Sequence, residues 1–210
     1  TSLSDIKNVL GIDKYLHQEG LSHRFIPVVA SDYHKDAGGV YIDGSYELLM
    51  ADDIRWGNLN LPEVSVDPES RRNLLFVKQA YMRLADALVN RNQNDSAIAV
   101  LDRCQEFFPD EKVPYDLYMM AYPEIYYRAG AMEKGDELIN KIIDNSTDNL
   151  RYFSELDDRF IPYYSESIRE NLAIINEMSN VASKYKRTEL ANSLNNLLEQ
   201  EFDKFLSVFN

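Results

Sequence analysis

The chain has 210 residues, of which 45% are apolar and 27% charged, and this composition is typical of a globular protein large enough to bury its own core. Its formal net charge of −13 would repel phosphate backbones and anionic lipid headgroups, so nucleic-acid binding and peripheral membrane binding are not expected. The single cysteine, Cys104, excludes an internal disulfide.

The sequence carries no signal for direct membrane insertion by this chain or for secretion. No apolar run approaches the roughly 18 residues that a membrane-spanning helix needs, and the start of the sequence shows no secretory signal. The sequence begins at Thr1 rather than at a methionine. We therefore expect a piece of a larger protein, with ordinary processing or tag removal as the alternative.

Residues 1–66 are predicted to form a small mixed α/β segment, because they hold six of the eight glycines and no long helical period. The predicted elements, in chain order, are one or two short helices in 4–19 that end at Gly20, a strand at 23–29, a second strand at 40–42, a helix at 45–54 and a loop at 56–66. Pro27 would confine the first strand to a sheet edge.

Residues 67–148 are predicted to form two helical hairpins. Asp67 is a good N-cap and Pro68 suits the first helical position. Apolar residues then recur at helical spacing to about residue 91, and again after a polar turn until Pro109 ends the second helix. The two stripes are Leu74, Val77, Tyr81, Leu84 and Leu88, followed by Ala97, Val100, Leu101, Cys104 and Phe108.

These hairpins follow the tetratricopeptide pattern, in which small residues let two antiparallel helices approach closely. The first copy consists of Tyr81, Leu84, Ala85, Leu88, Ala97, Leu101, Cys104 and Pro109, and the second, 38 residues later, of Tyr122, Tyr126, Gly135, Ile139 and Ile142. Pro123 replaces the small residue of the second copy and is expected to kink its helix. A generic helical bundle is the alternative.

Residues 149–210 are predicted to form a longer helical hairpin that packs on the second repeat and covers its open face. Its two stripes are Ile168, Leu172, Ile175, Met178, Ala182 and Tyr185, and then Leu190, Leu194, Leu197, Leu198, Phe202, Phe205 and Phe209. The predicted fold class is therefore mainly α, with stacked tetratricopeptide-like hairpins and a small N-terminal mixed α/β segment.

No constellation typical of catalysis is found in the sequence. The histidines His17, His23 and His34 do not have zinc-site spacing, and the calcium-loop resemblance of residues 32–43 fails because Ala37 stands where glycine is required. Acidic pairs such as Asp52-Asp53 could suit a glycosidase, but adjacent carboxylates usually point apart into solvent. We expect no catalytic residue, metal or cofactor, and expect Cys104 to pack between helices.

If the hairpins stack as in tetratricopeptide proteins, their inner face would carry a defined set of side chains. This predicted interaction face consists of Gln79, Met82, Asp86, Asn90, Glu124, Tyr127 and Arg128. The basic clamp that some such domains use for a peptide carboxylate is missing, because Met82 and Asp86 occupy its positions. The clustered tyrosines fit either the repeat core or a binding surface.

Several runs resemble a large family of bacterial multi-pass membrane proteins of unknown function, related to protein O-mannosyltransferases of the GT-C type. The runs are 15–21, Arg24-Phe25-Ile26-Pro27, Trp56-Gly57 and 97–115, and the resemblance covers most of residues 12–145. Residues 32–43 depart from the family pattern. The resemblance implies a soluble extracytoplasmic C-terminal region whose catalytic residues lie in an absent membrane half.

The sequence thus favours a non-catalytic protein-interaction or scaffold domain at the periplasmic face of the inner membrane. Its partner would be a protein: its own membrane half, an acceptor protein or a partner subunit. The alternative is a free-standing tetratricopeptide adaptor, for which a cytoplasmic location is also open. A carbohydrate-active enzyme that uses carboxylates around residues 32–53 is the third hypothesis.

Overall fold

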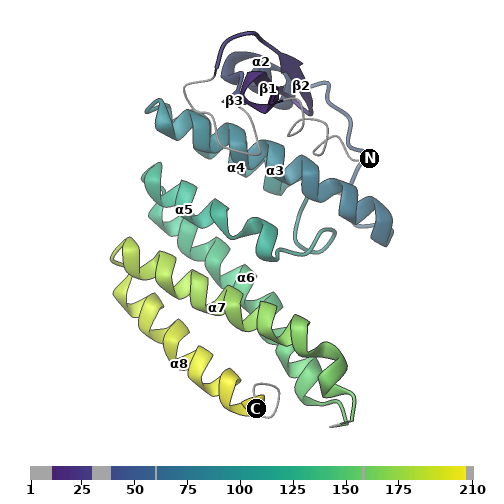
Figure 1. The fold of residues 1–210 in the computed structure, drawn as a ribbon, viewed down its shortest axis with the longest axis vertical. Coiled ribbons are helices and arrows are strands. Elements are labelled where there is room, and N and C mark those ends of the chain that lie inside the picture. Colours follow the sequence, from purple (N-terminus) through teal and green to yellow (C-terminus); the bar gives the residue numbers. More distant parts are fainter. Residues whose placement is uncertain (1–10, 30–38, 60, 158, 207–210) are drawn as a thin grey trace. The chain divides into compact units, whose positions relative to one another are not determined.

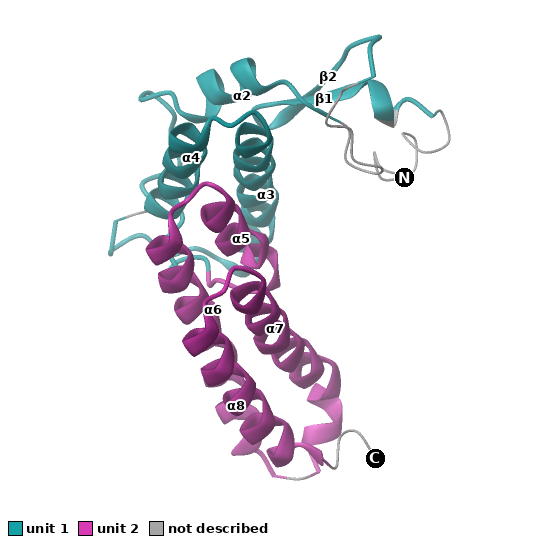
Figure 2. Ribbon diagram, turned by 90° about the vertical axis from the view of Figure 1, so that its left-hand side faces the viewer, with its two compact units in different colours: residues 1–113 teal, residues 114–210 magenta. Residues whose placement is uncertain are grey.

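The protein is mainly α-helical, as predicted, with a small three-stranded sheet near the N-terminus (Figure 1). The computed structural model describes residues 11–29, 39–59, 61–157 and 159–206. The chain divides into two compact units, Thr1–Val113 and Pro114–Asn210 (Figure 2). Within the described ranges, no helix has both the length and the apolar character that crossing a membrane requires.

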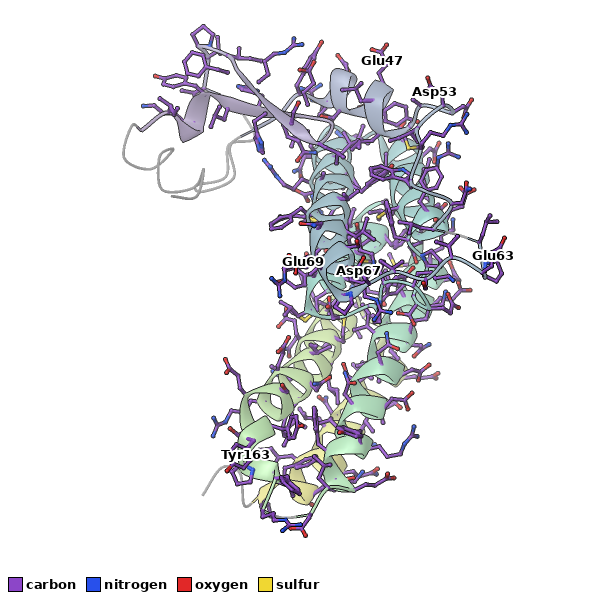
Figure 3. The ribbon with its side chains drawn as sticks, turned by 90° about the vertical axis from the view of Figure 1, so that its right-hand side faces the viewer. Glu47, Asp53, Glu63, Asp67, Glu69 and Tyr163 are labelled. Atoms are coloured by element: carbon purple, nitrogen blue, oxygen red, sulfur yellow. The ribbon has the colours of Figure 1, made fainter. Side chains whose placement is uncertain are left out.

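Unit 1 is built on an antiparallel pair of helices, α3 (Pro68–Asn90) and α4 (Asn94–Phe107). The start of α3 is as predicted, because Oδ1 of Asp67 accepts hydrogen bonds from the backbone N–H groups of Glu69 and Ser70, both at 3.0 Å. Figure 3 shows Asp67 and Glu69 at this end of the helix. The predicted stripe of α4 is buried throughout, Cys104 included, whereas the stripe of α3 is buried from Tyr81 onward and Leu74 and Val77 are only half-buried.

The N-terminal part of unit 1 differs from the prediction. Residues 16–25 form an antiparallel hairpin of β1 (Leu16–Glu19) and β2 (Ser22–Phe25), preceded by the short 3-10 helix η1 (Asp13–Tyr15). The helix predicted in 4–19 is therefore wrong for residues 16–19, and residues 4–10 lie outside the described part. Gly20 does not end a helix but occupies the two-residue hairpin loop, with φ +61°.

The other predicted elements of this segment are present with shifted ends. The predicted strand at 23–29 corresponds to β2, which lies at an edge of the sheet order β2-β1-β3. The second predicted strand is β3 (Gly39–Val40), which pairs parallel to β1 and stops before α2 (Ile42–Leu49) begins. The loop predicted at 56–66 is confirmed where it is described.

Unit 2 contains η2 (Leu117–Met119), α5 (Ala121–Arg128), α6 (Met132–Ser154), η3 (Ile161–Tyr164), α7 (Ser165–Lys184) and α8 (Thr188–Lys204). The C-terminal hairpin predicted within 149–210 is the pair α7–α8. The predicted boundaries at 66/67 and 148/149 do not coincide with the division into units, which falls at 113/114, and α6 is continuous across 148/149. Pro123 does not interrupt a long helix, because α5 starts only two residues before it.

The three helical hairpins share one turn. Each has a residue in the left-handed conformation: Asn92 between α3 and α4 (φ 59°), Gly130 between α5 and α6 (φ 89°) and Lys186 between α7 and α8 (φ 61°). In every turn the following residue donates its N–H to the carbonyl five residues earlier: Gln93 to Leu88, Ala131 to Tyr126 and Arg187 to Ala182, each at 2.9 Å. This is the hydrogen bond of the Schellman motif.

The residue five positions after each left-handed residue is small and buried. These residues are Ala97, Gly135 and Ala191. A small side chain there allows the second helix of a hairpin to approach the first closely. The α7–α8 hairpin therefore repeats the local geometry of the other two. The sequence pattern identified the small residue in the first two hairpins but missed Ala191 in the third.

Candidate interaction surface

The predicted interaction face comprises residues from both units. Gln79, Met82, Asp86 and Asn90 lie along one side of α3; Gln79 and Asn90 are exposed, whereas Met82 and Asp86 are half-buried. Nδ2 of Asn90 donates to Oδ2 of Asp86 at 3.3 Å. This stripe is therefore at least partly open to solvent within unit 1.

Tyr127, by contrast, does not belong to an open surface, and its inclusion in the predicted face was wrong. Its side chain is only 2% exposed, and its hydroxyl donates to Oδ1 of Asp136 at 2.6 Å. The guanidinium of Arg187 binds the same carboxylate, with Nε at 3.0 and 2.9 Å from the two oxygens. Burial, together with the hydrogen bond to Asp136, raises the pKa of Tyr127 above its usual value.

The other two predicted residues of α5 lie near the same junction. Glu124 is half-buried, and its carboxylate accepts bonds from Nζ of Lys184 at 2.7 Å and from the hydroxyl of Tyr185 at 3.2 Å. Partial burial acts to raise the pKa of Glu124, but the bond and charge of Lys184 outweigh it and lower the pKa. Arg128 is half-buried. The C-terminal end of α7 thus covers part of the predicted face in unit 2.

A groove runs between the β1–β2 loop and α3 in unit 1. It has a volume of about 270 Å³ and is lined by Gln18, Gly20, Leu21, His23, Phe76, Val77, Gln79, Ala80 and Arg83. We call it the hairpin groove. Gln79 is the one residue of the predicted interaction face that lines it.

A buried polar network fixes the wall that the hairpin contributes. Gln18 is 2% exposed, and its Nε2 donates to the backbone carbonyl of Ala80 in α3 at 2.9 Å. The carbonyl of Gln18 in turn accepts from the hydroxyl of Ser45 at 2.9 Å, and that hydroxyl also receives the N–H of Gly20 at 3.2 Å. Because these three hydrogen bonds are all buried, they hold the β1–β2 hairpin against α2 and α3.

Two large apolar side chains rim the hairpin groove. Phe76 is 69% exposed and Leu21 is 54% exposed. His23, Gln79 and Arg83 line the same groove and bring polar groups to it. Such a mixture of apolar surface and a few polar groups suits an apolar side chain carried by a polypeptide backbone.

Leu21 and Phe76 were not predicted as site residues. Leu21 was missed because Gly20 was interpreted as a helix stop, although a Gly-x pair between two alternating segments is also a hairpin signal. Phe76 lies next to the buried stripe of α3, and sequence periodicity alone gives no reason to single it out.

The residues considered for metal binding or catalysis do not converge where the structure describes them. Nε2 of His17 contacts the carbonyl oxygen of Val28 at 3.0 Å, and Cys104 is buried. Asp32, His34 and Asp36 lie outside the described residues. Elsewhere, no group of three or more potential metal ligands is found among the residues that the structure describes.

Comparison with protein-family models, with curated proteins and with solved structures finds no match to this chain.

Proposed function

We propose that this chain is a non-catalytic protein-interaction domain of the tetratricopeptide-like class, which holds a polypeptide partner at the hairpin groove. The observation that carries the proposal is the threefold recurrence of one hairpin turn, at Asn92, Gly130 and Lys186, each followed by a small buried residue. Arrays of similar hairpins build surfaces whose usual task is to bind other proteins.

The hairpin groove supplies the surface at which a polypeptide partner would bind. Phe76 and Leu21 expose apolar area at this groove, and the buried bond between Gln18 and Ala80 ties the β1–β2 hairpin to α3. A rigid surface loses little conformational entropy when a partner binds.

We further propose that the partner lies within, or acts together with, a membrane protein related to the O-mannosyltransferases. Support comes from the family resemblance, since its runs at 15–21 and 24–27 make up most of the hairpin that lines the groove. In that setting the domain lies on the periplasmic side of the inner membrane and holds an acceptor protein or partner subunit. Reading the coding sequence upstream of Thr1 tests this part, because a start codon directly before it favours a free-standing adaptor.

A photo-crosslinking amino acid at position 76 of the intact protein tests the groove itself. We expect a discrete crosslinked product with one polypeptide, which disappears when Leu21→Ser is added. The control places the same group at Asn140, an exposed position of α6. Identical products from positions 76 and 140, or unchanged partner recovery after deletion of residues 11–113, would contradict the proposal.

A further inference from the structure

The end of α6 and the connection from α6 to α7 in unit 2 expose several aromatic rings. Tyr163 is 84% exposed, Tyr152 55%, Phe160 44% and Tyr164 37%. Tyr152 lies in the last turn of α6, Phe160 directly precedes η3, and Tyr163 and Tyr164 belong to η3; Figure 3 labels Tyr163. We call this set the aromatic tip.

Packing holds two rings of the aromatic tip, and backbone hydrogen bonds shape the turns that carry the other two. Phe153 is nearly buried and anchors two of them, because its ring lies 5.6 Å from that of Tyr152 and 5.1 Å from that of Tyr164. The backbone N–H of Phe160 donates to the carbonyl of Asp157 at 2.8 Å, and that of Tyr163 to the carbonyl of Phe160 at 3.0 Å. Aromatic side chains fixed in this way lose little freedom on binding.

The charges around the aromatic tip are predominantly negative. Five described carboxylates, those of Asp148, Glu155, Asp157, Glu166 and Glu170, outnumber the three arginines Arg151, Arg159 and Arg169 in the same stretch. Arg151 already forms an ion pair with Asp148 at 2.8 Å, and Arg159 lies 3.4 Å from Asp157. The local charge therefore attracts cations and repels phosphate groups and anionic lipids.

Arg159 shows in the protein itself how a cation uses this surface. Its guanidinium stacks over the ring of Phe160 at 4.8 Å while its Nε faces the carboxylate of Asp157. A guanidinium or ammonium group of a partner would find exposed ring faces of the same kind at Tyr152 and Tyr163, within a stretch of net negative charge.

From these contacts we propose that the aromatic tip is a second binding surface, whose partner is a protein segment rich in arginine or lysine. Ring faces bind the cationic heads through cation–π contacts, and the surrounding carboxylates draw the segment toward them. This surface is composed of other residues than the hairpin groove and binds a partner of different chemistry.

A fluorescent twelve-residue peptide of alternating arginine and serine tests the proposal by titration with the full chain. We expect the double variant Tyr152→Ala/Tyr163→Ala to bind it about tenfold more weakly, as expected for two lost cation–π contacts. Tyr163→Phe keeps the ring face and should retain most of the affinity. Tyr118→Ala, which removes an exposed tyrosine elsewhere in unit 2, is the matched control and should bind as the unaltered chain does.

Two results would overturn the proposal. Equal affinity of the double variant and the unaltered chain would show that the peptide responds only to the overall negative charge. Tyrosine-dependent binding to phosphatidylcholine vesicles, without tyrosine-dependent binding of the peptide, would instead indicate contact with a bilayer. Far-UV circular dichroism and Tm of each variant verify folding, which removal of such exposed rings should leave intact.

Discussion

Gly135 is the residue on which the close approach of α5 and α6 most directly depends. A Cβ placed there would overlap the ring of Tyr127, and that ring cannot easily move aside. The hydroxyl of Tyr127 is hydrogen-bonded to Asp136, and the centroid of its ring lies 5.1 Å from that of Tyr185. We expect Gly135→Ala to destabilise the protein, because overpacking costs about 1–3 kcal/mol and exceeds the ~1 kcal/mol that alanine gains in helix propensity.

Urea unfolding followed by circular dichroism measures this effect. Asn140→Ala, at an exposed position of α6, is the control and should leave stability unchanged or slightly raised. In a Tyr127→Leu background the penalty should shrink, since a smaller side chain leaves room for the added methyl group. A Gly135→Ala protein as stable as the unaltered chain would show that the ring relaxes freely.

The candidate site was partly predictable at this scale. The periodicity of α3 placed Gln79, Met82, Asp86 and Asn90 on one side of the helix, because helical spacing alone determines that. It could not show that Tyr127 and Glu124 are engaged by Tyr185 and Lys184, sixty residues later in the chain. Contacts across that distance depend on tertiary packing, about which a local pattern carries no information.

At the scale of the element, the turn that the three hairpins share allows the same position to be compared in each of them. The left-handed conformation is unfavourable for residues with a Cβ, and Lys186 adopts it where the second hairpin uses Gly130. We expect Lys186→Gly to stabilise the protein by up to about 1 kcal/mol, because strain is relieved at some cost in unfolded-chain entropy. Gly130→Ala should destabilise it by a similar amount.

Thermal unfolding of the three turn variants checks the series. Asn92→Gly should change Tm least, because asparagine tolerates the left-handed region better than lysine does. A Tm that falls on Lys186→Gly would mean that the lysine side chain contributes more at this turn than its backbone costs.

The helices of the hairpins were predictable because their apolar stripes are long and their ends carry clear signals, such as Asp67 and Pro68. The β1–β2 hairpin was not, because its strands have four residues each and β2 is exposed throughout. What stabilises it is the buried contact of Gln18 with Ala80, 62 positions away, and a polar residue is not recognisable as a core residue from sequence.

At the scale of the whole molecule, the net charge of −13 is the dominant electrostatic feature. It is spread over both units, and self-repulsion of this kind opposes the compact state. Ion pairs such as that of Glu124 with Lys184 act in the other direction, but they are partly exposed, so each contributes little. We therefore expect repulsion to outweigh attraction at neutral pH.

This balance predicts that salt stabilises the protein. Raising sodium chloride from about 0.01 M to about 0.15 M shortens the screening length from roughly 30 to 8 Å, which suppresses long-range repulsion more than contact pairs. Tm at neutral pH should therefore rise with salt. The variant Glu177→Lys/Glu199→Lys, at two exposed helical positions, makes the net charge less negative and should have both a higher Tm and a weaker response to salt. Asn196→Gln, an uncharged change on α8, should alter neither the Tm nor its dependence on salt. A Tm that falls as salt is added would mean that ion pairs, and not repulsion, dominate the electrostatics of the fold.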